Sequence, residues 1–198
     1  MGVMTLVRPP ALEHGDVIVR EGPFTVAERD ALPDNGYRHE LLDGVLVMSP
    51  APRPRHQTIA FELAVRLRAA VPRDLRVFLA PFDLRLGERT ALQPDVLVVR
   101  RDGVTESGLS GAPLLAVEVL SPSTRAYDLG PKKDLLAAAG CPSYWTIDPA
   151  GPRLTVWSLE GDRYVRTADV AAQETWTATA PFAVTITPHD LLDEEGAP

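Results

Sequence analysis

Two short segments of this chain are apolar on both faces of an extended strand. They cover residues 92–99 and 114–120, and their apolar runs are Leu97-Val98-Val99 and Leu115-Ala116-Val117. Successive side chains of a strand point to opposite faces, so a strand that is apolar at every position must be covered on both sides. Strands of this kind belong to sheets that carry helices on their faces. The two segments therefore predict a layered α/β sheet.

Each of these segments also carries one carboxylate. By strand alternation, Asp95 shares a face with Leu97, and Glu118 shares a face with Ala116 and Leu120. Burying an unpaired charge costs roughly several kcal/mol, so a positive partner is expected between the two acids. Neighbouring strands lie about 4.8 Å apart, which would let both acids reach one hard metal ion at about 2.0 to 2.6 Å. The alternative is that arginines at the strand ends neutralise both acids.

The composition fits one globular domain and limits the classes of function. The chain has 198 residues, of which 45% are hydrophobic and 24% are charged, enough for one sizeable core. Its single cysteine, Cys141, excludes an intramolecular disulfide and a cysteine-based zinc site. The net charge of −7 argues against a general nucleic-acid coat, although it leaves room for a local basic site. Without a membrane-length apolar run or a signal-peptide pattern, we expect a cytoplasmic protein that does not bind membranes.

Turn and capping signals divide the chain into a single domain and two ends. We expect an irregular arm at residues 1–21, one domain at 22–192 and an acidic tail at 193–198. Within the domain, Asp43-Gly44 predicts a tight turn with positive φ between two strands. The predicted helices are a short one between Thr25 and Pro33, one at 56–71 and one that begins at Pro131 and stops at Gly140. The predicted strands are 37–42, 45–48, 76–85 with an interruption at Pro81, 92–99, 114–120, 144–147, 154–159, 164–166 and 183–186.

The helix at 56–71 has an apolar stripe and additional apolar residues outside it. The stripe repeats every four residues, at Ile59, Leu63 and Leu67. Phe61 and Val65 lie off this stripe. They indicate a second buried contact, for which another subunit is one candidate.

The helix that begins at Pro131 places a lysine among apolar residues. Lys132 precedes Leu136 by four residues and Ala139 by seven, so it lies on the face that packs against the sheet. A lysine in a first turn opposes the helix dipole by about 0.3 to 1 kcal/mol, so an anionic neighbour is expected. The Asp95 and Glu118 pair is the obvious candidate. The alternative is that Lys132 buries only its stem and extends its ammonium to water.

Three other positions leave their roles open. Glu40 is either an exposed strand residue or a third carboxylate of the same cluster. His39 and His56 could bind phosphate or transfer protons, although a polar surface role is the simpler interpretation. The segment Ser121-Pro122-Ser123-Thr124 could contact phosphate, although a polar turn is again the simpler interpretation.

Several motifs, taken in their order along the chain, resemble the Uma-two family of endonucleases. That family belongs to the PD-(D/E)xK nuclease superfamily. The resemblance covers roughly residues 24–160 and is specific because the motifs keep their order. The matching motifs are Glu40, Pro94-Asp95, residues 118–124, residues 128–132 and residues 140–149.

The resemblance implies an α/β fold with a restriction endonuclease-like core, a mixed central β-sheet flanked by helices. It also implies that Asp95 is the metal-binding aspartate and Glu118 the acid of the second motif. The chain departs from the superfamily pattern at Leu120, where a lysine is expected two residues after the acid. In the resembled family a lysine on the following helix takes over, and this position is Lys132. The helical phase derived above agrees with that assignment.

The resemblance further implies a metal-dependent endonuclease that hydrolyses phosphodiester bonds in nucleic acid, with DNA as the expected substrate. Asp95, Glu118 and the Val119 carbonyl would hold Mg²⁺, or Mn²⁺ in its place. Lys132 would orient water or neutralise charge on the phosphate, and Glu40 would complete the shell or bind a second ion. The alternatives are a nuclease-derived binding or structural module without turnover, and a hydrolase of small phosphoesters. Because cleavage of a duplex needs two cuts, we also expect a homodimer.

Overall fold

The structure is a computed structural model that describes residues 17–18 and 22–192. The predictions for residues 1–16, 19–21 and 193–198 lie outside the described residues; they concern most of the irregular arm and the acidic tail. Within the described part, the helices are all too short or too polar to cross a membrane.

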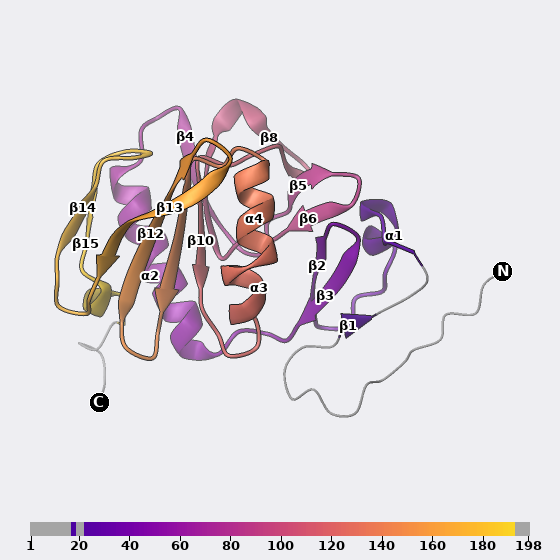
Figure 1. Ribbon diagram of the computed structural model, residues 1–198, viewed down its shortest axis with the longest axis horizontal. Helices are drawn as coiled ribbons and strands as arrows, with labels where there is room; N and C mark the ends of the chain where they lie inside the picture. Colours follow the sequence, from indigo (N-terminus) through magenta and orange to yellow (C-terminus); the bar gives the residue numbers. More distant parts are fainter. Residues whose placement is uncertain (1–16, 19–21, 193–198) are drawn as a thin grey trace.

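A six-stranded mixed sheet forms the centre of the molecule (Figure 1). Its strand β10 (Leu115–Val119) runs parallel to β11 (Ser143–Asp148) and antiparallel to β7 (Val96–Arg100). All five residues of β10 and the first four of β7 are buried, so the prediction that these strands are covered on both faces is confirmed. The strand order is β13-β12-β11-β10-β7-β4, and the remaining strands are β4 (Leu75–Leu79), β12 (Arg153–Glu160) and β13 (Arg163–Val170).

Helices cover both faces of this sheet. In Figure 1, α3 (Arg125–Leu129) and α4 (Pro131–Ala138) lie in front of the sheet, and α2 (Pro54–Ala70) lies behind it. The predicted helices at 56–71 and from Pro131 are confirmed, although α2 begins at Pro54, because proline is well suited to the first turn. The short helix α3 was not predicted.

A seven-stranded sheet packs beside the central sheet, in the order β1-β3-β2-β6-β5-β9-β8. Its hairpin joins β2 (Arg38–Leu42) to β3 (Val45–Ser49) through Asp43 and Gly44, whose φ angles of 45° and 85° confirm the predicted turn. The strand β1 (Val17–Ile18) pairs with β3, so the prediction of an irregular arm is wrong at these two residues. The other strands are β5 (Leu84–Gly87), β6 (Thr90–Leu92), β8 (Val104–Thr105) and β9 (Gly108–Ser110).

Two of the predicted strands are each divided in the structure. The predicted strand 76–85 becomes β4 and β5, which confirms its interruption at Pro81, and the predicted strand 92–99 becomes the last residue of β6 and most of β7. In both cases the chain passes from one sheet to the other at a proline, Pro81 or Pro94, which has no N–H to donate to a ladder. Asp95 therefore lies directly before β7 and not inside a strand.

The remaining elements close the core. Helix α1 (Val26–Asp30) begins at the predicted capping box of Thr25 and Glu28. The strands β14 (Trp176–Ala178) and β15 (Val184–Ile186) form a small third sheet, in which β14 was not predicted. Short 3₁₀ turns are η1 (Arg101–Gly103) and η2 (Pro188–Leu191). On the α4 side, one apolar cluster joins both large sheets to the helix through residues that include Leu42, Leu92, Leu97, Ala116 and Leu136.

Candidate active site

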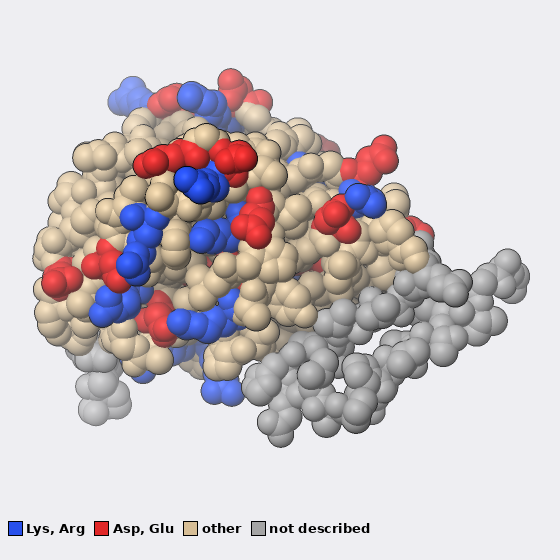
Figure 2. Space-filling view, viewed as in Figure 1, with Lys and Arg blue, Asp and Glu red and all other residues tan. Residues whose placement is uncertain are grey.

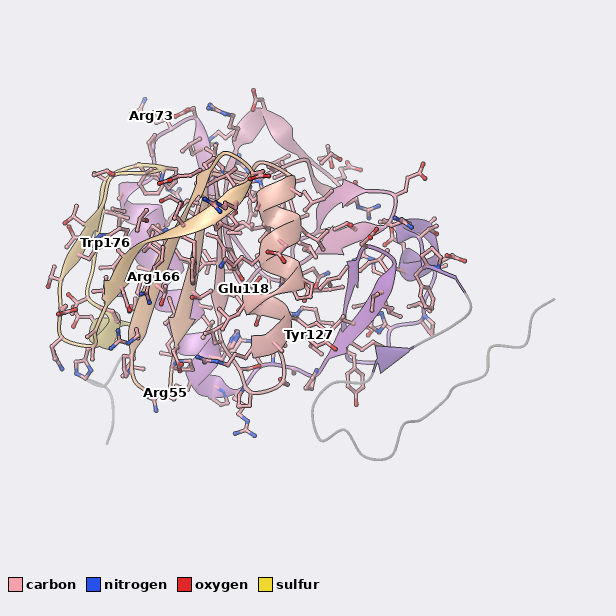
Figure 3. All side chains as sticks on the ribbon, viewed as in Figure 1. Arg55, Arg73, Glu118, Tyr127, Arg166 and Trp176 are labelled. Atoms are coloured by element: carbon pink, nitrogen blue, oxygen red, sulfur yellow. The ribbon has the colours of Figure 1, made fainter. Side chains whose placement is uncertain are left out.

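Four carboxyl groups and one lysine come together where the two large sheets meet α3 and α4. Strand β2 supplies Glu40, the link before β7 supplies Asp95, and β10 supplies Glu118. Helix α3 supplies Asp128 and α4 supplies Lys132. All five side chains are buried, each at 4% exposure or less. Figure 3 labels Glu118, which lies beside α3 and α4 in that view.

Lys132 is the centre of this cluster. Its Nζ lies 2.6 Å from Glu118 Oε1, 2.8 Å from Glu40 Oε1 and 3.8 Å from Asp128 Oδ1. These three contacts are ion pairs. Burial would lower the pKa of Lys132, but the three carboxylates outweigh it and raise that pKa above its ordinary value. The ammonium does not reach water, so the alternative of an exposed lysine is wrong.

The acids around Lys132 differ in how well they are compensated. Burial raises the pKa of Glu118 well above its ordinary range, and Lys132 opposes this shift, while the neighbouring carboxylates reinforce it. Burial likewise raises the pKa of Asp128 to about 6. Burial also acts to raise the pKa of Glu40, but Lys132, Arg38 and a 2.6 Å hydrogen bond from the Gln93 N–H outweigh it and lower that pKa. Glu118 is thus the acid whose negative charge the site compensates least.

Asp95 has partners of its own. Its Oδ1 accepts a hydrogen bond from Arg38 at 3.0 Å, and its Oδ2 accepts one from the Val119 N–H at 2.8 Å. His56 Nε2 also lies 3.0 Å from Oδ2. Burial would raise the pKa of Asp95, but His56 and Arg38 outweigh it and lower that pKa. The arginine alternative is therefore correct in part: Arg38 neutralises Asp95, whereas a lysine lies against Glu118.

Sequence reasoning missed Arg38 and did not favour His56 as a site residue. Arg38 precedes Glu40 by two positions on β2, so both side chains point to one face of the strand, and its Nε lies 3.7 Å from Glu40 Oε2. This spacing of two residues in the sequence could have identified Arg38 as a neighbour of Glu40. His56 lies in the first turn of α2, and only the packing of α2 against the sheet brings it to Asp95. The predicted cluster of Glu40, Asp95, Glu118 and Lys132 is otherwise together in the structure.

The chemistry of this cluster fits a hard cation. Carboxylate oxygens are the ligands that Mg²⁺ and Mn²⁺ prefer, and four buried carboxyl groups face only two permanent cations, Lys132 and Arg38. Moreover, Oε1 of Glu118 is buried, and its contact among the described residues is the ion pair with Lys132. Within that same part of the chain, no three His, Cys, Asp or Glu side chains are already spaced to hold one ion. A bound cation would therefore share the acids with the lysine and the arginine.

Asp95 is the acid that meets the molecular surface. It lines a cavity of about 700 Å³ together with Arg38, His56, Tyr37 and Gln93. The side chains of Glu40, Glu118 and Lys132 do not line this cavity. A ligand that enters it therefore meets Arg38, His56 and Asp95 first.

Comparisons with known proteins identify the family and the fold. The sequence profile of the Uma2 family, described as "Putative restriction endonuclease", matches residues 26–189. A crystal structure of a "putative nuclease belonging to DUF820" from Anabaena variabilis ATCC 29413 superimposes with a TM-score of 0.71 at 22% identity, over 86% of this chain and 98% of that one. No curated protein matches the chain. The expected restriction endonuclease-like α/β fold is confirmed, and the chain belongs to the Uma2 family of restriction endonuclease-like nucleases.

Proposed function

We propose that the protein is a metal-dependent endonuclease that hydrolyses phosphodiester bonds in DNA. The observation that carries the proposal is the excess of buried carboxyl groups over permanent cations around Lys132. A fold gains nothing from an excess of buried negative charge, which costs several kcal/mol per uncompensated ion on the usual order of magnitude. Such an excess is useful where a divalent cation binds. Family membership supports nuclease chemistry, and the donor atoms support the choice of Mg²⁺ or Mn²⁺.

Each residue of the site has a role that follows from its surroundings. Asp95 and Glu118, with the Val119 carbonyl, would hold the cation, which when bound polarises the phosphate and lowers the pKa of water. Lys132 holds Glu118 and Glu40 in place through its ion pairs. Its raised pKa keeps it protonated at neutral pH, so it stabilises negative charge and does not act as a general base. Glu40 would complete the shell or contribute to a second ion.

Arg38 and His56 lie between the cavity and the candidate metal-binding acids. Both contact Asp95, and both line the cavity through which a phosphodiester would arrive. The Arg38 guanidinium matches the geometry of a phosphate group. We therefore assign Arg38 a second role, in which it turns from Asp95 to the incoming phosphate when a cation takes its place at the carboxylate.

Isosteric variants test the catalytic proposal. Asp95→Asn and Glu118→Gln keep the shape of each side chain and remove its charge. Purified protein should nick supercoiled plasmid in Mg²⁺ and lose this activity in EDTA, and each variant should lose at least about 100-fold in rate. Glu106→Gln is the matched control, because Glu106 is exposed in the turn between β8 and β9 and lines neither of the cavities beside Asp95. If both site variants cleave plasmid as fast as the unchanged protein, the catalytic assignment is wrong.

The same geometry favours a second candidate function, a nuclease-derived binding module without turnover. Its specific support is that Arg38 and Lys132 already lie at ion-pair distances from Asp95 and Glu118, where a bound cation would have to compete with them. Calorimetric titration with Mg²⁺ and with Mn²⁺ separates the two candidates. A catalytic site should release or absorb heat that disappears in Asp95→Asn, whereas a module without a metal site should give no heat that depends on Asp95. A parallel panel of small phosphoesters tests the remaining alternative, a small-phosphoester hydrolase.

We propose in addition that two copies associate through α2 and β4. Phe61 and Val65 are 57% and 47% exposed, which confirms that they lie off the buried stripe, and Leu79 is 39% exposed. Strand β4 is at the edge of the six-stranded sheet, so its outer backbone groups are available for pairing within the described part of the chain. A second β4 could pair with it about a two-fold axis. Light scattering should give a mass in solution twice that of one chain. Val65→Glu should reduce this mass to that of a single chain. A single-chain mass for the unchanged protein at micromolar concentration contradicts this proposal.

A further inference from the structure

A second cavity lies on the other side of Arg38 and His56. It has a volume of about 390 Å³, and it shares Arg38, Pro52 and His56 with the cavity in front of Asp95. The two cavities are therefore joined at the residues that contact Asp95. A chain-like ligand placed in this groove would pass from one cavity to the other across the candidate active site.

The two cavities differ in charge. The cavity in front of Asp95 is lined by Asp30, Asp34, Asp83 and Asp95, and also by Arg29 and Arg38, which pair with three of those acids. The second cavity is lined by residues that include Arg38, Arg53 and Arg55, and no acid among the described residues lines it. In a chain with a net charge of −7, a cavity of this kind is a local reversal of sign. The second cavity therefore offers a polyanion arginines without an ion-pair partner in the described part of the chain, whereas the arginines of the first cavity are already paired with acids.

Arg53 and Arg55 are available to an external anion. Both are exposed, and neither makes a side-chain hydrogen bond or an ion pair with any described residue. The neighbouring Arg125, in contrast, is held by Asp148 at 2.7 Å. Figure 2 shows acidic and basic side chains interspersed on the face with α3 and α4, so this face has no broad basic surface that would compete for a polyanion.

Polar groups complete the lining of the second cavity. The turn after β10 contributes Ser121, Ser123 and Thr124, whose hydroxyl groups cluster around Ser121 Oγ at 2.9 Å. This turn begins two residues after Val119, whose N–H donates to Asp95. The basic cavity is thus tied through the backbone to the metal-binding strand.

We infer that Arg53 and Arg55 bind the phosphate backbone of the nucleic acid on one side of the bond that is cut. This inference rests on the proposed function. It adds the direction in which the nucleic-acid strand leaves the active site, which is through the basic cavity between α2 and the turn at residues 121–124. Arg53 and Arg55 are positioning residues, since they do not contact the metal-binding acids. The sequence 121–124, for which a polar turn was the simpler interpretation, forms the opposite wall of this cavity.

The test compares two double variants of the full chain. Arg53→Gln/Arg55→Gln removes the proposed contacts. Arg73→Gln/Arg101→Gln is the matched control, because both of its arginines are exposed and have no ion-pair partner among the described residues. Figure 3 shows Arg73 near the upper edge of the molecule and Arg55 near its lower edge. The probe is a fluorescent DNA duplex, bound in the presence of Ca²⁺ at several salt concentrations, and plasmid cleavage in Mg²⁺ is measured alongside.

The site variant should weaken duplex binding about tenfold, and it should reduce the slope of log Kd against log salt by about 2, one unit for each phosphate contact. The control should keep the Kd, the salt slope and the cleavage rate of the unchanged protein. If the unchanged protein cleaves DNA and the site variant keeps its salt slope, the inference is wrong and the proposed function stands. If the unchanged protein binds DNA with this arginine-dependent slope but does not cleave it, the inference stands and the catalytic proposal is wrong. The inference is also wrong if free inorganic phosphate binds to the protein but the duplex does not bind at physiological salt.

Discussion

Replacement of Lys132 by methionine is the change that most directly examines how this site is held together. Methionine has nearly the volume of the lysine stem and lacks the ammonium. The variant therefore keeps the packing beside Leu136 and leaves Glu118 and Glu40 without the cation that now lies 2.6 Å and 2.8 Å from their oxygens.

The expected magnitude follows from burial. Lys132 and Glu118 are each 1% exposed, so water cannot screen the charges that remain. Removal of one partner of a buried ion pair costs about 3 to 5 kcal/mol, and we expect a loss of unfolding free energy in this range at pH 7. The opposite change, Glu118→Gln, should cost less than about 1 kcal/mol or increase stability, because the raised pKa of Glu118 shows that its charged form is disfavoured in the folded protein. A folded-state pKa that is raised contributes stability below the unfolded value of the carboxyl group, and that stability is lost as the pH rises.

Urea unfolding at pH 7 and at pH 5, followed by circular dichroism, measures both effects. Lys132→Met should lose less stability at pH 5 than at pH 7, because the orphaned carboxyl groups can take up protons there. The double variant Lys132→Met/Glu118→Gln should recover part of the loss at pH 7. Equal losses for the two single variants, or a loss below about 1 kcal/mol for Lys132→Met at pH 7, would refute the reasoning that the site carries an excess of negative charge.

Two other changes test the scaffold around the site. Arg29 pairs with Asp83, whose pKa is lowered because its hydrogen bonds and ion pairs outweigh burial. Asp83 therefore contributes stability above its unfolded pKa, and this stability is lost as the pH falls through the lower, folded value. Asp83→Asn should flatten the acid limb of a stability profile measured by urea unfolding between pH 7 and pH 3. An unchanged acid limb would show that this carboxyl group does not contribute. Gly44→Ala should cost at least about 1 kcal/mol, because Gly44 has a φ of 85° and a Cβ there would lie 2.3 Å from the Cβ of Pro23. Gly36→Ala is the control, with a similar φ of 78° and no atom within 4 Å of the added Cβ, and thermal unfolding should show a larger loss for Gly44→Ala.

Local signals predicted the elements where the chain itself carries the cause. The capping box at Thr25, the positive-φ turn at Asp43-Gly44 and the helix start at Pro131 depend on neighbouring residues, and each is present. The divided strands failed for a different reason. Pro81 indicated the interruption of 76–85, but period and composition at 76–85 and 92–99 do not reveal that the two parts of each segment belong to different sheets, since that depends on which strands pair.

The candidate site shows the same division. Helical phase was enough to place Lys132 on the buried face of α4, and strand alternation was enough to place Glu118 among apolar side chains. Neither helical phase nor strand alternation could identify the ion-pair partners of the buried acids. Arg38 reaches Asp95 across 57 residues of sequence, and His56 reaches it only because α2 packs against the edge of the sheet where β7 begins.

The sequence by itself determined the layered α/β character, the two helices that matter for the site and the acids that must be neutralised, because each follows from side chains a few residues apart. The tertiary structure alone decided that a lysine lies against Glu118 and an arginine against Asp95, and that the acidic and basic cavities meet at His56. Charges separated by many residues come within a few ångströms only when two sheets and three helices have packed, and electrostatic pairing depends on that distance and on the exclusion of water.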